Sequence, residues 1–109
     1  MEALAIYSNS QRSPHTARNA GYRLRAFAAW LDREQGVTDL EQVQTRHVLA
    51  YRDALMARQS PSSAARSIET VRAFFRWCRE QGYIHTDPAA GVKAPRPVLK
   101  AEPLYVDTA

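Results

Sequence analysis

The segment from Ser60 to Gly82 constrains the fold most strongly, because its apolar residues recur with the period of a one-sided helix. Ser60 and Pro61 form a typical helix start, with serine as the N-cap and proline at the first helical position. Gly82 is a typical helix end. The apolar positions between them are Ala64, Ile68, Val71, Phe75 and Cys78, broadened by Phe74. The segment therefore predicts one long helix with a single buried side.

Two further helices follow the same plan. Ser13 and Pro14 open one that Gly36 ends, with an expected length of about 20 residues or roughly 30 Å. Its apolar stripe is Ala17, Ala20, Leu24, Phe27, Ala28 and Leu31. Thr45 is predicted to cap the other, which should end near residues 57–58. The stripe of this helix is Val48, Tyr51 and Leu55.

Shorter elements are predicted around these three helices. A helical turn is expected over 39–43, and Asp87 with Pro88 should start one or two turns that stop by Gly91. Residues 1–11 are weakly patterned, and three of them are expected to pack on the domain as a helical turn: Leu4, Ile6 and Tyr7.

No stretch alternates apolar and polar residues for long enough to predict a strand, so the predicted fold class is all-α. A chain of 109 residues supplies one core and is too short for two. We therefore expect an N-terminal segment over 1–12, a helical domain over 13–94 and a basic, proline-rich linker over 95–109.

Positive charge is concentrated on two of the predicted helices. Thirteen of the fifteen cationic residues are arginine, whose planar fork suits phosphate and guanine. Two groups of arginines stand out. The first has no acidic residue between its members and consists of Arg12, Arg18, Arg23 and Arg25. The second has only Glu69 between its members and consists of Arg66, Arg72, Arg76 and Arg79. Taken alone, this charge fits either a nucleic-acid-binding face or a merely solvated basic surface.

Enzymatic and metal-binding functions find no support in the sequence. The three histidines lie on different elements without metal-ligand spacing, and are predicted to be surface or capping residues: His15, His47 and His85. There is no glycine-rich phosphate loop and no G-x-S-x-G motif. Cys78 is the only cysteine and should be a small buried hydrophobe. We expect no catalytic residue, no metal and no cofactor.

No apolar run approaches the length of a membrane span, and the first residues lack the plan of a signal peptide, so a cytoplasmic protein without membrane contact is expected.

Nucleic-acid binding is the chemistry that the helix starts favour. A helix N-terminus has free N–H groups and a partial positive charge that attract phosphate. Hydroxyl, imidazole and amide side chains at the two arginine-bearing helix starts can reach base edges; these are Ser13, His15, Thr16 and Asn19, and Ser60, Ser62 and Ser63. Trp30 and Trp77 are predicted to pack at the rim of the core rather than to stack on bases.

Three motifs, in order and spacing, are similar to those of one family. They are Ser13-Pro-His-Thr-Ala-Arg-Asn19 followed by Leu24, Phe27 and Trp30-Leu31; then Val43-x-Thr45-x-x-Val48-x-x-Tyr51; then Ser63-Ala-Ala-Arg66-x-Ile68-x-x-Val71-Arg72-x-Phe74-Phe75-Arg76-Trp77. Over roughly residues 10 to 105, the chain resembles the N-terminal, SAM-like core-binding domain of Xer-type tyrosine recombinases and phage integrases.

The resemblance implies a compact bundle of four to five helices that clamps one face of a DNA recombination site. It also implies the residues that bind double-stranded DNA: His15, Thr16, Asn19 and Arg23 from one helix, Ser62, Ser63, Arg66 and Arg72 from the other, and Lys93 and Arg96 on the linker. The charge distribution adds Arg18 and Arg76 to these candidates. Ala20 and Gly21 depart from the family pattern and are expected to thin the groove-facing surface.

In the resembled family, the catalytic residues belong to a second domain, so none of the five tyrosines is expected to be a nucleophile. The chain is expected to be a non-catalytic monomer in solution that binds DNA together with other recombinase protomers. The main alternative is a helical protein-interaction adaptor with a basic face. A stand-alone helix-turn-helix regulator is less well supported, because no short helix pair with a glycine-containing turn is present.

Overall fold

The computed structural model describes residues 2–11 and 13–95. Within them every regular element is a helix, which confirms the predicted all-α class. The elements, in chain order, are α1 (Glu2–Asn9), α2 (Pro14–Trp30), the π-helical turn η1 (Leu31–Gln35), the 3₁₀ turn η2 (Leu40–Gln42), α3 (Thr45–Arg58) and α4 (Pro61–Glu80).

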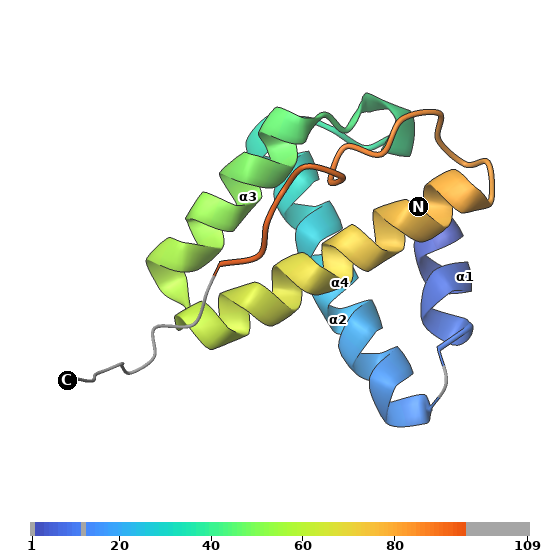
Figure 1. Ribbon diagram of the computed structural model, residues 1–109, viewed down its shortest axis with the longest axis horizontal. Coiled ribbons are helices and arrows are strands. Elements are labelled where there is room, and N and C mark those ends of the chain that lie inside the picture. Colours follow the sequence, from blue (N-terminus) through green and yellow to red (C-terminus); the bar gives the residue numbers. More distant parts are fainter. Residues whose placement is uncertain (1, 12, 96–109) are drawn as a thin grey trace, which may run out of the picture.

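Helix α4 is the centre of the bundle (Figure 1). Helix α2 crosses α4, α1 packs against both, and α3 packs against α4 on the other side. The segment after α4 returns along α3, where Arg52 Nη1 donates a hydrogen bond of 3.2 Å to the carbonyl oxygen of Lys93. In the described part of the chain, no helix is both long enough and apolar enough to cross a bilayer.

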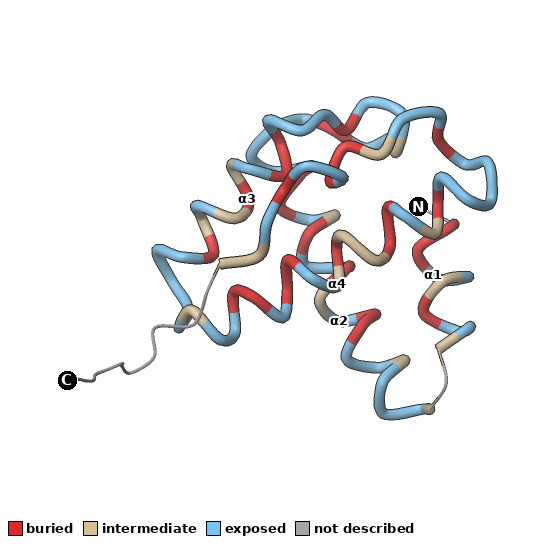
Figure 2. The backbone as a smooth tube through the Cα atoms, in the orientation of Figure 1, coloured by how far each residue is buried: buried red, intermediate tan, exposed pale blue. Residues whose placement is uncertain are grey.

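Most of the predicted stripe residues form the core (Figure 2). In α2 the prediction is wrong for Ala17, which is half-buried and lies outside the core, and Ala28 is only half-buried at its edge. All six stripe residues of α4 are buried, as are the three of α3.

Phe27 of α2 joins the two sets, because its ring lies 4.8 Å from that of Tyr51 and 5.9 Å from that of Phe75. Burial of each large apolar side chain stabilises the fold by about 1.5–3 kcal/mol. Trp30 is also buried, and its ring lies 5.1 Å from that of Tyr51.

Both serine–proline helix starts have the predicted geometry. Ser13 Oγ accepts a hydrogen bond from the Thr16 amide at 3.1 Å, and Ser60 Oγ accepts one from the Ser63 amide at 3.2 Å. The predicted glycine ends are also present, because Gly36 and Gly82 have φ angles of 66° and 84°. A residue with a β-carbon rarely adopts this left-handed conformation.

The start of α3 differs from the prediction. Gln44, not Thr45, is the N-cap, since Gln44 is the last residue with an extended backbone (φ −117°, ψ 165°). His47 Nδ1 accepts a hydrogen bond of 2.9 Å from the Gln44 amide. His47 is therefore a capping residue, which confirms one of its two predicted roles. It is not a surface residue, because its side chain is buried.

In the two shorter predicted segments, at residues 1–11 and 87–91, the structure also differs in part from the prediction. Residues 2–9 form a two-turn helix in which Leu4 is buried and Tyr7 is half-buried, whereas Ile6 is 42% exposed and does not belong to the core. Residues 88–91 form hydrogen-bonded turns and not a helix. Asp87 still caps them, because its Oδ1 accepts a hydrogen bond of 2.8 Å from the Ala89 amide.

The prediction that Gly21 lies at the groove-facing surface is wrong. Gly21 is buried under α1, and a β-carbon there would lie 3.4 Å from Ser8 Oγ and 3.0 Å from Arg25 Nη1. Gly21 therefore faces α1, and its missing side chain does not thin the exposed face.

Candidate nucleic-acid interface

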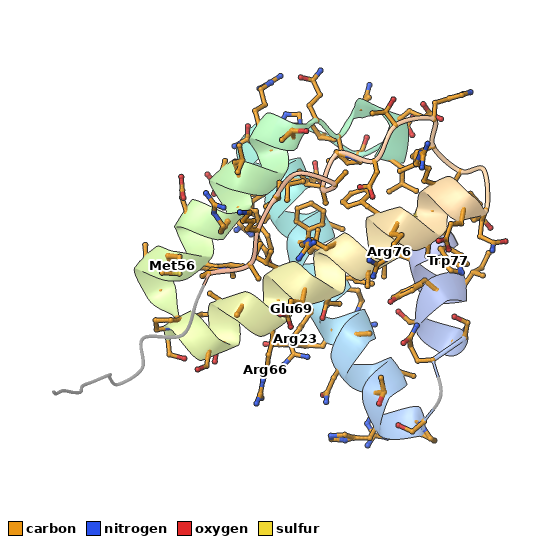
Figure 3. The ribbon with its side chains drawn as sticks, viewed as in Figure 1. Arg23, Met56, Arg66, Glu69, Arg76 and Trp77 are labelled. Atoms are coloured by element: carbon orange, nitrogen blue, oxygen red, sulfur yellow. The ribbon has the colours of Figure 1, made fainter. Side chains whose placement is uncertain are left out.

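A groove runs along the crossing of α2 and α4, and we call it the crossing groove. It has a volume of about 320 Å³ and is lined by Tyr7, Gln11, Thr16, Asn19, Ala20, Arg23, Arg66, Glu69, Thr70 and Ala73. Figure 3 labels Arg23, Arg66 and Glu69 on the side of α4 that faces α2. The groove therefore combines two arginines with hydroxyl and amide groups that come from α1, the segment after it, α2 and α4.

A second hollow shares Asn19 and Arg23 with the crossing groove, and we call it the serine hollow. Its other lining residues are Tyr22, Gln59, Ser60, Ser63 and Ser67. It lies at the start of α4, where the helix presents its free amide groups. Five predicted DNA-binding residues thus line these two adjoining surfaces: Thr16, Asn19, Arg23, Ser63 and Arg66.

Three other predicted residues are exposed near the same helix starts without lining either hollow: His15, Arg18 and Ser62. His15 is connected to the lining, because its Nε2 lies 3.2 Å from Asn19 Nδ2, within hydrogen-bonding distance. The side chains of Arg18 and Ser62 make no hydrogen bond or ion pair with the lining among the described residues, so the candidate site is centred on the residues that line the two hollows.

Arg72 and Arg76 lie on a different surface, which we call the arginine groove. Its volume is about 480 Å³, and it is lined by Arg72, Arg76, Arg79, His85, Thr86, Asp87, Ala89 and Ala90. On a helix with 3.6 residues per turn, Arg72 is about 120° around α4 from Arg66. The predicted arginines of α4 therefore do not share one surface.

The linker candidates are only partly described. Lys93 is exposed, and its backbone carbonyl is held by Arg52. Arg96 lies outside the described residues, as do Arg12 and nearly all of the predicted linker.

The arginines of the three surfaces have no carboxylate partner among the residues that the structure describes. There, ion pairs join Arg33 to Glu34 at 3.0 Å and His85 to Glu41 at 3.7 Å. Asp87, the one acid of the arginine groove, already accepts the Ala89 amide. The guanidinium groups therefore keep their donors for an external anion.

Sequence reasoning missed several lining residues, namely Gln11, Tyr22, Gln59, Ser67, Glu69, Thr70 and Arg79. Tyr22 is 72% exposed, the most exposed large hydrophobic residue among those described. A helical wheel of α4 would have predicted Glu69 and Thr70 as neighbours of Arg66. Both lie within about 60° of Arg66 around the helix axis and within about one turn of Arg66 along the helix.

Reactive and metal-binding groups are not found at these surfaces. Cys78 is buried in the core, and burial raises the pKa of its thiol to about 12, so the thiol stays protonated at neutral pH. Across the described residues, no three of the histidine, cysteine and acidic side chains form a group that could hold a metal ion.

Comparison with known proteins identifies the fold family. Residues 4–82 match the model of the phage integrase N-terminal SAM-like domain. Among curated proteins, tyrosine recombinase XerC of Pseudomonas putida is 30% identical over 103 residues, covering 88% of this chain and 33% of the relative. XerC of Serratia marcescens is 36% identical over 88 residues, covering 79% of this chain and 28% of the relative. XerC of Salmonella typhi is 34% identical over 89 residues, covering 79% and 29%.

The chain thus spans about a third of the length of these recombinases. No solved structure matches it significantly. The family match covers α2, α3 and α4 entirely, the helices that supply most of the core and most of the residues that line both surfaces at the crossing. Since that match extends over most of the chain, the chain belongs to the family of phage integrase N-terminal SAM-like domains.

Proposed function

We propose that the chain is the core-binding domain of a site-specific tyrosine recombinase or integrase, and that it binds duplex DNA in a sequence-directed way. The observation that carries this proposal is the crossing groove, where Arg23 and Arg66 meet Thr16 and Asn19 without a carboxylate partner among the described residues. Family membership supports the same function.

The residues of the two hollows have complementary roles in this proposal. The arginines bind guanine edges or phosphate, while Thr16, Asn19 and Ser63 read other base edges. The N-terminus of α4 adds free amide groups and the positive end of the helix dipole, which attract a phosphate. His15, Arg18 and Ser62 flank this surface and reach the neighbouring backbone.

The arginine groove supplies contacts to phosphate in the same proposal. Arg72 and Arg76 lie away from the crossing groove, so they contact the sugar–phosphate backbone rather than the bases read there. Lys93 and Arg96 extend this cationic surface along the chain beyond α4. Such contacts position a protein on DNA without reading its sequence.

The partners that follow are double-stranded DNA and other recombinase protomers bound to it, in the cytoplasm. The domain itself contributes binding, and a different part of the recombinase performs strand cleavage. Three features of the fold support this division between DNA binding and strand cleavage. They are the compact core, the arginines at the surface and the chain that leaves the bundle along α3.

Fluorescence anisotropy with a labelled duplex tests the proposal, using Arg66→Ala and the matched control Arg33→Ala. Both changes remove one positive charge, but Arg33 is exposed outside the three surfaces and pairs with Glu34. We expect Arg66→Ala to weaken binding roughly 5- to 100-fold and Arg33→Ala to leave it nearly unchanged.

Equal effects of the two substitutions would contradict the proposed groove. Weak, salt-independent binding to every duplex, combined with tight binding to an acidic protein, would favour the protein-interaction adaptor instead.

A further inference from the structure

Glu69 is the only acidic residue among those that line the crossing groove and the serine hollow. It is exposed, it projects from the middle of α4, and it lies with Arg23 and Arg66 on the side facing α2 (Figure 3). In the described part of the chain its carboxylate takes part in no ion pair and accepts no side-chain hydrogen bond. The Glu69 carboxylate is thus an unused hydrogen-bond acceptor within a surface that is otherwise cationic and polar.

A carboxylate in such a surface opposes contact with phosphate. Two negative groups in close approach repel each other, so Glu69 weakens any binding that relies on the DNA backbone alone. An ionised carboxylate can only accept hydrogen bonds. It therefore becomes favourable on DNA only where a base edge presents a donor to it.

The base edges of the major groove differ in what they offer a carboxylate. Guanine presents two acceptors, and thymine presents an acceptor and a methyl group. Adenine presents a donor, but its N7 acceptor lies beside that donor and repels a carboxylate. Cytosine presents the N4 amino donor and no acceptor. Cytosine is consequently the base that Glu69 fits best.

We infer that Glu69 is a specificity-determining residue, which selects a cytosine in the major groove and disfavours other bases at that position. The inference rests on the proposed function, because it assigns a role within the same DNA-binding surface. Arg23 and Arg66 bring the DNA close, and Glu69 makes that approach depend on the base it meets.

Selection from a randomised duplex pool, followed by titration of single base-pair variants of the selected site, tests this role. The 109-residue chain is compared with Glu69→Ala, Glu69→Gln and the control Glu80→Gln. Glu80 is also an exposed acid of α4, but it lines none of the surfaces described above. Melting curves by circular dichroism verify that each variant remains folded.

The unaltered chain should prefer cytosine at one position by roughly 5- to 100-fold, the discrimination expected of a good contact to a base. Glu69→Ala should lose that preference and bind unrelated duplexes more tightly. Glu69→Gln should move the preference to adenine at the same position, because an amide pairs with adenine N6 and N7. Glu80→Gln should change no base preference.

Two results would overturn the inference, and they are distinguishable. If Glu69→Ala and Glu69→Gln raise the affinity for all duplexes equally and leave every base preference unchanged, Glu69 is only a repulsive charge, while DNA binding stands. If the unaltered chain selects no duplex from the pool, the proposed function itself is wrong, and the role of Glu69 falls with it.

Discussion

Single residues of this domain combine structural and binding roles at the helix starts. Ser60 caps α4 through the Ser63 amide and also lines the serine hollow, so one hydroxyl group serves stability and the proposed interface. His47 caps the start of α3 and has only this structural role. Its ring is buried, and Nδ1 accepts the Gln44 amide, which requires that nitrogen to carry no proton.

His47 predicts a pH-dependent stability. Burial, followed by the charge of Arg46, lowers the pKa of His47 below its ordinary value of about 6.5. The unfolded chain therefore binds a proton at a higher pH than the folded chain does. The stabilisation from neutral His47 is complete above that ordinary value and is lost as the pH falls below it toward the lowered pKa.

Urea unfolding between about pH 7 and 5.5 measures this effect. The free energy of unfolding of the unaltered chain should fall across this range. His47→Asn should show a smaller fall, because an amide oxygen can accept the Gln44 amide and does not titrate. Identical pH profiles for the two proteins would show that His47 is not the responsible group.

At the scale of elements, the approach of α1 to α2 depends on a small residue at position 21. The glycine is buried between the two helices, and the atoms nearest to a β-carbon at this position belong to Ser8 of α1 and to the side chain of Arg25. A glycine within a helix costs about 1 kcal/mol relative to alanine. A β-carbon at this position would meet only the end of the Arg25 side chain at 3.0 Å and Ser8 Oγ at 3.4 Å, so an alanine can be accommodated, whereas a larger side chain would enter the space of Ser8.

Substitution at Gly21 should have opposite effects for small and large side chains. Gly21→Ala should raise the free energy of unfolding by up to about 1 kcal/mol, because the end of the Arg25 side chain can move aside and helix propensity improves. Gly21→Leu should lower it by about 1–3 kcal/mol, because the longer side chain enters the space of Ser8. Thermal or urea unfolding of both variants measures the difference, and a stabilised Leu variant would show that α1 does not pack closely here.

At the scale of the whole molecule, the arginines that line the hollows described above lie on two separate surfaces. The crossing groove and the serine hollow adjoin each other at Asn19 and Arg23 of α2, while the arginine groove lies beside the C-terminal half of α4. We propose that the first surface reads bases, with additional contact to phosphate at the start of α4, and that the second contacts only the DNA backbone. The two surfaces should then respond differently to salt, because only phosphate contacts release bound counterions.

Titrations between about 50 and 200 mM salt separate these contributions. The double substitution Arg72→Ala/Arg76→Ala should make the plot of log affinity against log salt shallower by about 0.9 for each phosphate that is no longer neutralised. Asn19→Ala should weaken binding without changing the slope, because an amide neutralises no phosphate. A steep slope retained in the double variant would place the backbone contacts elsewhere.

The sequence alone determined the three long helices and most of their buried positions. The spacing of Ile68, Val71 and Phe75, the serine caps and the glycine ends are local signals, and each acts within one or two helical turns. The same local signals misplaced the cap of α3, because glutamine is not among the preferred N-cap residues and the Gln44 amide is instead held by the His47 ring. The family resemblance, drawn from the order of these motifs, is confirmed by the family match over residues 4–82.

Only the tertiary structure decided which exposed residues share a surface. Arg66 and Arg72 are equivalent in sequence, both arginines on the exposed side of one helix, yet the crossing of α2 joins Arg66 to Asn19 and leaves Arg72 with the turns after α4. The position of Gly21 under α1 likewise could not be predicted from the sequence. The physical reason is that a helical pattern defines which side of a helix is buried, whereas the packing of separate helices against one core decides which exposed side chains become neighbours.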